Sequence, residues 1–379
     1  MVRSFQNPSA REDSSRRRFL KASAGCVMAS GLPACATQAA DAAAQARARG
    51  SALLDTVLSV DMHSHAGGVL GRNAVARDIA SPMKQGKLSA LCLSLVSDSI
   101  LLAHDSQKQY ARREPRPGEL HAYLSNRMDF ADRLIADQKL ARILTLADLR
   151  ASQRQGVPGA VLAVEGSDFL EGRVEHLQTA YDRGIRHWQL VHYRADNALG
   201  DIQTEHPLYG GATPFGLDVV RRCNQLGLVL DVAHATLPTV KQVAQVSTTP
   251  LVLSHTGFST DGLKPETRWI GIDHARHVAD TGGVVGIWAN GHSFNTLADY
   301  ANSIARLVEA IGIDHVGIGT DMEAMHPPTM PSYADWSELI GHLLTHFTAT
   351  EVAKIAGGNY LRVFDQVTRP KGGAARSAT

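Results

Sequence analysis

Short apolar runs alternate with longer amphipathic segments from residue 55 onward, and this alternation constrains the fold more than any other feature of the chain. Eight of the runs are typical of buried strands: 57–61, 89–95, 160–164, 187–191, 228–232, 250–254, 283–288 and 315–320. Helical periodicity occupies segments between them, at 123–139, 173–183, 215–226, 238–246, 273–281 and 298–311. Strands that alternate with helices in this way form parallel βα units.

Eight strands in one undivided stretch predict a single α/β domain, a (β/α)8 TIM barrel of the metal-dependent hydrolase type with a closing C-terminal helix near 350–364. The alternative is an open doubly wound sheet, but no glycine-rich phosphate loop follows the first run. A hydrophobic fraction of 44% is ample for one large core, which excludes a disordered or fibrous chain.

The first 36 residues are expected to be an export signal rather than part of the fold. The heptapeptide Ser15–Lys21, SRRRFLK, matches a twin-arginine signal, whose export machinery carries folded proteins. The stretch 22–32 is too short and too rich in small residues for a membrane span, which needs about 20 apolar residues. Residues 34–36 suit a signal peptidase, although residues 32–35 also resemble a lipoprotein box, which makes a lipid anchor at Cys35 the alternative. We therefore expect a periplasmic or exported protein.

The remaining boundaries follow from composition. Residues 37–51 are alanine-rich and are expected to form a linker or frayed helix. Residues 52–366 are expected to form the barrel and residues 367–379 a disordered tail.

Lys and Arg number 38 against 37 Asp and Glu, so no bulk charge favours nucleic acid, and no nucleic-acid partner is expected. The chain has 17 histidines but only 4 cysteines, which favours nitrogen and oxygen ligands over thiolates in any metal site.

Polar residues with metal-ligating or acid–base side chains follow six of the eight apolar runs. They are His63, His65, Glu165, His192, His234, His255 and Asp321. In a (β/α)8 barrel the chemistry lies at the carboxyl ends of the strands, so we expect these side chains to converge. A single histidine or carboxylate at a strand end is more often structural, but their joint placement predicts a metal site.

The expected chemistry follows from these side chains. Imidazole and carboxylate ligands at an open site suit Zn²⁺, with Mn²⁺, Co²⁺ or Fe²⁺ as alternatives. Two such ions about 3.5–4 Å apart would bridge a water, lower its pKa and polarise a carbonyl oxygen. Glu165 is the natural bridging ligand because its carboxylate has two oxygens, and Asp321 is the expected general base.

Taken together, these motifs resemble the renal (membrane) dipeptidase family of the amidohydrolase superfamily over roughly residues 52–366. The resemblance rests on His63-x-His65 and on the segments Glu165–Gly166, 190–192, 231–234, 254–256, 317–321 and 357–364. It implies a hydrolase that uses two zinc ions to cleave the amide of dipeptides and tolerates a D-residue on the C-terminal side. We also expect a homodimer.

The resemblance also implies a role for each matching residue. His63, His65 and Glu165 would hold the first metal ion, and Glu165, His234 and His255 the second. His192 would bind the scissile carbonyl or the oxyanion, and Arg268 would pair with the free carboxylate of the substrate.

Two departures affect what the resemblance implies. His65 stands where these dipeptidases carry Asp, which changes the charge at one metal and bears on its identity, and 320–324 reads TDMEA in place of SDFDG, which bears on specificity. Another amidohydrolase substrate, such as an N-acyl amino acid, cyclic amide, lactone or phosphoester, is the alternative function. A non-catalytic metal- or peptide-binding protein is a third, which the presence of Asp321 disfavours.

Overall fold

The computed structural model describes residues 32–70, 75–104, 109–204, 206–261 and 268–369. Its contacts divide the chain into two units, Met1–Ala43 and Ala44–Thr379. The predicted signal motif at residues 15–21 lies outside the described residues. Helix α1 (Leu32–Leu54) includes residues 37–51, the segment expected to be a linker or frayed helix. No helix in the described ranges has the length and apolarity needed to cross a bilayer.

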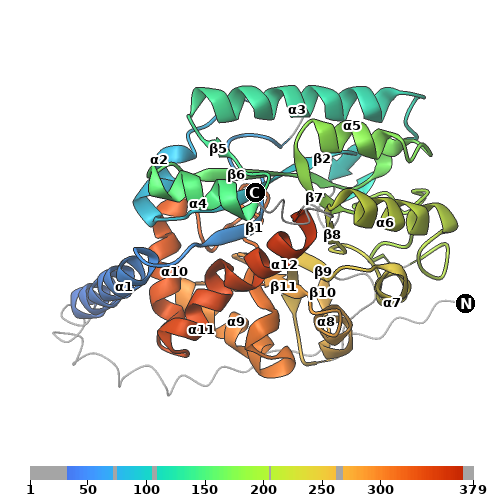
Figure 1. The fold of residues 1–379 in the computed structure, drawn as a ribbon. Coiled ribbons are helices and arrows are strands. Elements are labelled where there is room, and N and C mark those ends of the chain that lie inside the picture. Colours follow the sequence, from blue (N-terminus) through green and yellow to red (C-terminus); the bar gives the residue numbers. More distant parts are fainter. Residues whose placement is uncertain (1–31, 71–74, 105–108, 205, 262–267, 370–379) are drawn as a thin grey trace, which may run out of the picture. The chain divides into compact units, whose positions relative to one another are not determined.

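The second unit is built on one parallel sheet whose strands follow each other in chain order, β1-β2-β6-β7-β8-β9-β11-β12 (Figure 1). Their bounds are Val60–Ser64, Ala90–Val96, Gly159–Glu165, Ile185–Gln189, Val229–Asp231, Leu251–Phe258, Val284–Ile287 and Val316–Ile318. Short strands β5 (Ala141–Arg142) and β10 (Trp269–Ile270) pair with β6 and β9, and β3 (Leu102–His104) forms a separate antiparallel pair with β4 (Gln109–Ala111).

Two backbone hydrogen bonds join the two ends of the sheet. The amide of Asp321 donates to the carbonyl of His63, and the amide of His65 donates to the carbonyl of Met322, both at 3.0 Å. These bonds bring the carboxyl end of β1 against the segment that follows β12 and nearly close the sheet into a barrel. The predicted (β/α)8 fold is therefore confirmed.

Helices cover the outer face of the sheet (Figure 1). They are α2 (Ala80–Gly86), α3 (Glu119–Asp137), α4 (Leu146–Arg154), α5 (His176–Asp182), α6 (Pro214–Leu226), α7 (Leu237–Val246), α8 (Ile272–Ala279), α9 (Leu297–Ile311), α10 (Trp336–Leu343), α11 (Ala349–Ala353) and α12 (Asn359–Thr368). Local sequence sets their ends: in α6 the Thr213 hydroxyl accepts the amide of Gly216, and Gly227 ends the helix at a φ of 78°.

Two apolar clusters hold the sheet in place. The larger lies between the sheet and the surrounding helices. The smaller contains the strand residues Val60, Met62 and Val161 and packs against Tyr360 and Phe364 of α12, which is the predicted closing helix. Since α12 runs to Thr368, the tail expected from residue 367 begins inside this helix, and residues 370–379 lie outside the described part.

The first strand begins at Val60, three residues after the predicted start. Val57 and Leu58 are partly buried against the core although they precede the strand, and a short apolar run does not distinguish the two environments. As a result, His63 lies within β1 and His65 follows it directly.

Candidate metal centre

The seven strand-end residues predicted to converge do so, and all are buried. His63 lies in β1, Glu165 ends β6 and His255 lies in β9, while the others stand one to three residues beyond their strands. None of the seven is more than 5% exposed. The parallel strand order places their carboxyl ends together, which is why residues up to 258 positions apart in sequence share one site.

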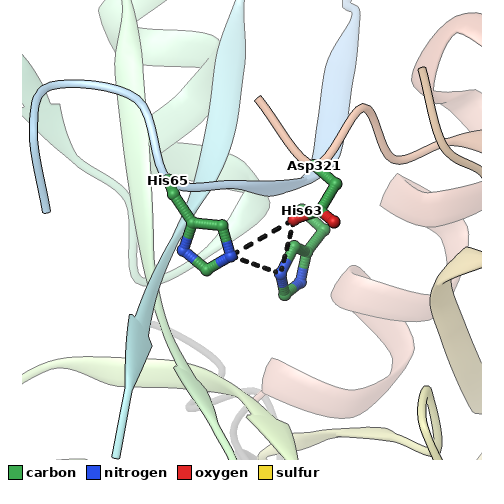
Figure 2. A group of neighbouring side chains, drawn as sticks. All are labelled: His63, His65 and Asp321. Atoms are coloured by element: carbon green, nitrogen blue, oxygen red, sulfur yellow. Dashed lines mark hydrogen bonds and ion pairs between the residues drawn. The ribbon is translucent and has the colours of Figure 1, made fainter. Parts of the chain in front are cut away.

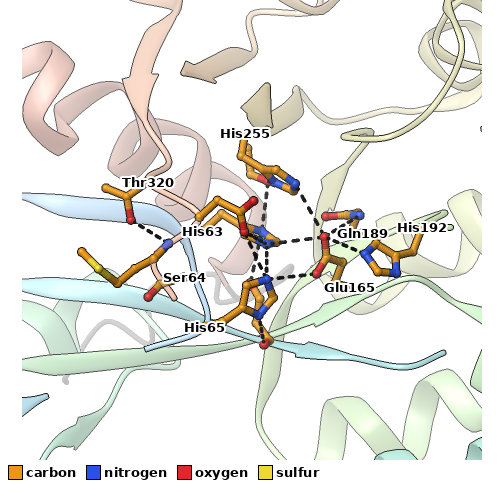
Figure 3. A network of polar contacts seen from close by, with 12 residues as sticks. His63, Ser64, His65, Glu165, Gln189, His192, His255 and Thr320 are labelled. Carbon is orange, nitrogen blue, oxygen red and sulfur yellow. Dashed lines mark hydrogen bonds and ion pairs between the residues drawn. The ribbon is translucent and has the colours of Figure 1, made fainter. Parts of the chain in front are cut away.

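Glu165 lies at the centre of the site, and five imidazoles direct their Nε2 atoms at its carboxylate. Figure 3 shows His63, His65, His192 and His255 around it. Four of them face Oε1, and the fifth, His65, lies 3.2 Å from Oε2. The distances to Oε1 are 3.5 Å from His63, 3.4 Å from His192, 3.2 Å from His234 and 3.6 Å from His255. One carboxylate thus contacts every histidine of the predicted site.

Asp321 forms a second small group with His63 of β1 and with His65, which follows that strand (Figure 2). Its Oδ1 lies 3.3 Å from Nε2 of His65 and 3.8 Å from Nε2 of His63, and these two nitrogens are 3.2 Å apart. The general base predicted from sequence is therefore beside the residues predicted to hold the first ion.

Serines fix the orientation of three of the rings. The carbonyl of Ser94 lies 3.0 Å from Nδ1 of His65, and since a carbonyl only accepts, Nδ1 carries the proton. The hydroxyl of Ser254 lies between Nδ1 of His63, at 3.3 Å, and Nδ1 of His255, at 2.9 Å. In each case Nε2 is left to face the centre, as in the outer-shell contacts of metal-bound histidines.

The charges of the site fit a metal cation. Burial opposes ionisation of Glu165, but the neighbouring His192 and His63 hold its pKa well below the ordinary value. Burial also lowers the pKa of His65, yet Asp321 and Glu165 outweigh it and raise that pKa to about 10, so Nε2 lies where positive charge is favoured. For His234 and His255, burial lowers the pKa well below the usual range, which keeps them neutral as ligation requires.

Hydrogen bonding leads to the same conclusion. Oε2 of Glu165 is buried and accepts no hydrogen bond from the described residues, since the His65 Nε2 that faces it carries no hydrogen when Nδ1 is the donor. Ligand atoms of three overlapping groups lie within 4.8 Å of one another: His63, His65 and Asp321; His63, Glu165 and His255; Glu165, His192 and His234. Clustered imidazoles and carboxylates offer lone pairs that a divalent cation would satisfy. The residues present therefore fit such a group.

Backbone conformation at the site is unusual. His234 and Asp321 have φ of 68° and 55°, in the left-handed region that side chains other than glycine rarely adopt. Gly166 follows Glu165 with a φ of 80°, and a Cβ there would lie 2.9 Å from the Cβ of His192. The Glu-Gly pair is thus required by the close approach of two strand ends.

Asp98 is a site residue that the sequence analysis missed. Its Oδ1 lies 2.6 Å from Nδ1 of His192, and it is fully buried. Burial lowers the pKa of His192, but Asp98 and Glu165 together raise it above the ordinary value. Asp98 stands two residues after β2, so the strand-end rule that found the other residues could also have found this one.

Arg268 presents one free edge of its guanidinium group. Nη1 donates to Oε1 of Gln203, and the ring of Trp288 lies 5.4 Å from the guanidinium carbon. Nε and Nη2 are buried and meet no hydrogen-bond partner among the described residues, although the neighbouring Tyr193 also favours the charged guanidinium. These two N–H groups form the fork that binds a carboxylate in two places. Gln203 and Trp288 hold this arginine. The role of Gln203 had no signal in the sequence.

Glu323 is one of the departures from the SDFDG pattern, and its side chain contacts the loop after β1. Its carboxylate accepts the amides of Gly67 and Gly68 at 3.2 and 3.0 Å. It therefore ties the segment after β12 to the loop after β1.

Comparisons with known proteins agree with the class that the fold and site define, a metal-dependent TIM-barrel hydrolase. The model of the membrane dipeptidase family (peptidase family M19) matches residues 47–377. The chain therefore belongs to this family, as its motifs predicted.

Individual relatives are more distant. Dipeptidase aclJ of Aspergillus oryzae is 28% identical over 55% of this chain and 51% of its own length, so the chain spans about half the length of the curated relatives it matches. The probable dipeptidase PvdM of Pseudomonas aeruginosa has a TM-score of 0.71 at 18% identity, covering 86% of this chain and 98% of that one.

A further crystal structure, a metallo peptidase from Rhodobacter sphaeroides liganded with a phosphinate mimic of the dipeptide L-Ala-D-Ala, has a TM-score of 0.65. It is 17% identical, and the match covers 82% of this chain and 99% of that one. At these identities the two structures support the fold alone.

Proposed function

We propose that this chain is a binuclear metal-dependent dipeptidase that hydrolyses the amide bond of dipeptides, including those with a C-terminal D-residue. One observation carries the proposal: five imidazole Nε2 atoms surround the buried carboxylate of Glu165, with the carboxylate of Asp321 beside them. Membership of the membrane dipeptidase family supports it.

The ligands divide between two ions. His63, His65 and Glu165 would hold the first, and Glu165, His234 and His255 the second. Zn²⁺ suits this nitrogen and oxygen set best, with Mn²⁺, Co²⁺ and Fe²⁺ as alternatives. When bound, such ions supply Lewis-acid chemistry that acidifies a water molecule and polarises a carbonyl.

The chain's own residues move the protons. Oδ1 of Asp321, beside His63 and His65, takes the proton of the attacking water and returns it to the leaving amine. Asp98 accepts Nδ1–H of His192, so a protonated Nε2 can donate to the oxyanion of the tetrahedral intermediate. Burial of both residues excludes the water that would compete for these bonds.

Arg268 provides substrate recognition. Its free Nε and Nη2 would bind the C-terminal carboxylate of the dipeptide, an arrangement that Gln203 supports from the opposite edge. The L-Ala-D-Ala mimic in the Rhodobacter sphaeroides structure is consistent with a dipeptide whose second residue is D.

We also propose that the chain is exported by the twin-arginine machinery to the periplasm and acts as a homodimer, with a lipid on Cys35 as an alternative to signal cleavage. A reporter fused to residues 1–40 tests the export signal: Arg16→Lys together with Arg17→Lys should abolish export. Mass spectrometry of the mature N-terminus tests cleavage against lipidation, and sedimentation of the purified protein tests the dimer.

The central experiment is elemental analysis of the purified protein with an assay on L-Ala-L-Ala and L-Ala-D-Ala. Two ions per chain and turnover that is lost in Asp321→Asn are expected. Two ions without turnover of any dipeptide in a wider panel would refute the substrate, and no ion after reconstitution would refute the metal centre.

A further inference from the structure

Two buried aspartates, Asp61 and Asp231, occupy equivalent places near the histidines of the metal centre. Asp61 lies in β1 two residues before His63, and Asp231 ends β8 three residues before His234. Both are 0% exposed. A buried carboxylate requires several donors to offset its loss of hydration, so the identity of those donors indicates what each aspartate does.

In Asp61, a single oxygen joins two strand ends. Its Oδ1 accepts the backbone amides of His63, at 3.3 Å, and of Thr320, at 2.8 Å. Thr320 directly precedes Asp321, so this oxygen ties the end of β1 to the end of β12, where the barrel closes. The other oxygen, Oδ2, accepts the hydroxyls of Thr320 and Tyr333 at 2.5 and 2.6 Å.

Asp231 repeats this pattern on the other side of the site. Its Oδ1 accepts the backbone amides of Ala233, at 2.9 Å, and of Ser254, at 3.0 Å. These residues directly precede His234 and His255, so this oxygen ties the end of β8 to β9. Its Oδ2 pairs with Nε2 of His187 at 2.9 Å, and Nδ1 of that ring meets the hydroxyl of Tyr360 in α12 at 3.0 Å.

From this shared pattern we infer that Asp61 and Asp231 are positioning residues, each of which holds two strand ends of the metal centre through one oxygen. Asp61 holds the ends that carry the ligands His63 and His65 and the base Asp321, and Asp231 holds the ends that carry the ligands His234 and His255. Asp61 serves the ion of His63 and His65, and Asp231 serves the ion of His234 and His255. The inference rests on the two-ion centre of the proposed function. A positioning role requires only that Oδ1 of each aspartate accepts the two backbone amides. An electrostatic role would require the negative charge of the carboxylate.

Conservative substitutions distinguish these roles. Asn keeps an oxygen at Oδ1, and its amide can donate to the hydroxyls of Thr320 and Tyr333 at position 61, or to a neutral His187 ring at position 231. Ala removes the tie and leaves two buried amides without an acceptor. Glu at either position keeps the charge but displaces the acceptor oxygen by one methylene group. Where an alanine variant fails to fold, the glutamate variant is measured in its place.

The experiment is a chelator-competition titration of Zn²⁺ on the full-length protein, which gives a dissociation constant for each ion. His65→Asn and His255→Asn identify which constant belongs to which half of the centre. Asp61→Ala should weaken the ion assigned by His65→Asn about 10- to 100-fold, the range known for residues that support metal ligands, and change the other less than about threefold. Asp231→Ala should do the reverse.

Matched controls complete the design. Asp61→Asn and Asp231→Asn should each leave both constants within about threefold of wild type. Tyr333→Phe removes the hydroxyl that bonds Oδ2 of Asp61 and the Ser64 hydroxyl, and it should do the same because Oδ1 of Asp61 keeps both backbone amides. Asparagine variants as damaging as alanine would overturn the inference in favour of charge. Equal weakening of both ions by each alanine variant would overturn it in favour of general destabilisation. A wild-type chain that binds fewer than two ions would overturn the binuclear proposal itself, and this inference with it.

Discussion

Replacing Arg268 by Met tests substrate recognition most directly, because the structure isolates two donor groups for one ligand. Nε and Nη2 are buried and meet no hydrogen-bond partner in the part of the chain that the structure describes, so both are available to a substrate carboxylate. A hydrogen bond to a charged group contributes about 1.5–3 kcal/mol, and taking the lower figure for each bond gives a loss of about 3 kcal/mol. That loss corresponds to a fall in kcat/KM of roughly 150-fold.

The assay compares a dipeptide with its C-terminal amide, which lacks the carboxylate. Wild-type enzyme should cleave the amide less efficiently than the dipeptide, because the amide keeps one acceptor oxygen but places an NH2 donor against the second N–H of the arginine and lacks the negative charge. In Arg268→Met the two substrates should differ little, because the partner of the carboxylate is gone. Metal content should match wild type, since Arg268 is not among the grouped ligands.

Arg268→Lys provides the matched control. Lysine keeps the positive charge but has no planar fork, so the expected loss is intermediate, about tenfold. The reasoning is refuted if Arg268→Met still prefers the dipeptide over its amide by the same factor as wild type, since the substrate carboxylate must then bind elsewhere.

Three further predictions concern catalysis, metal and pH. Asp321→Asn should lower kcat about 10²- to 10⁴-fold with two ions still present by elemental analysis, and unchanged kcat would exclude Asp321 as the base. Chelation should lower the free energy of unfolding in denaturant titrations, by about 4 kcal/mol relative to metal at 1,000 times its Kd. Burial lowers the pKa of His274 to about 4, below the unfolded value, so stability should fall by up to about 3 kcal/mol as pH drops from 6.5 to 4. His274→Leu should remove that part of the pH dependence.

The barrel could be predicted from the sequence because its strands are buried on both faces. Such strands read as continuous apolar runs, and each of the eight runs corresponds to a strand of the sheet. The short helices α2 and α10 and the β3–β4 pair were not predicted, although α5 and α8, which are as short, lie within the predicted segments 173–183 and 273–281.

The convergence of the site could be predicted for a similar reason. In a parallel barrel all strands run in the same direction, so polar residues at their carboxyl ends all lie at the same end of the barrel. The contact of Ser94 could not be predicted, because Ser94 acts through its backbone carbonyl. Asp98 follows the strand-end rule, but its contact with His192, 94 residues away, is known only from the folded chain. A hydrogen bond to a backbone carbonyl does not depend on the residue type, so the sequence does not indicate it.

The backbone conformations of His234 and Asp321 are set by tertiary contacts and not by the residue types themselves. Neither residue favours the left-handed region, so tertiary bonds must hold them there: the amide of Asp321 donates to the carbonyl of His63, and the amide of Gln203 donates to the carbonyl of His234. Both bonds join segments that meet only in the closed barrel. The ligand geometry is therefore a property of the folded chain and not of the separate strand-end motifs. A centre of this kind is best loaded after folding, which accords with the twin-arginine export proposed here, since that route carries folded proteins.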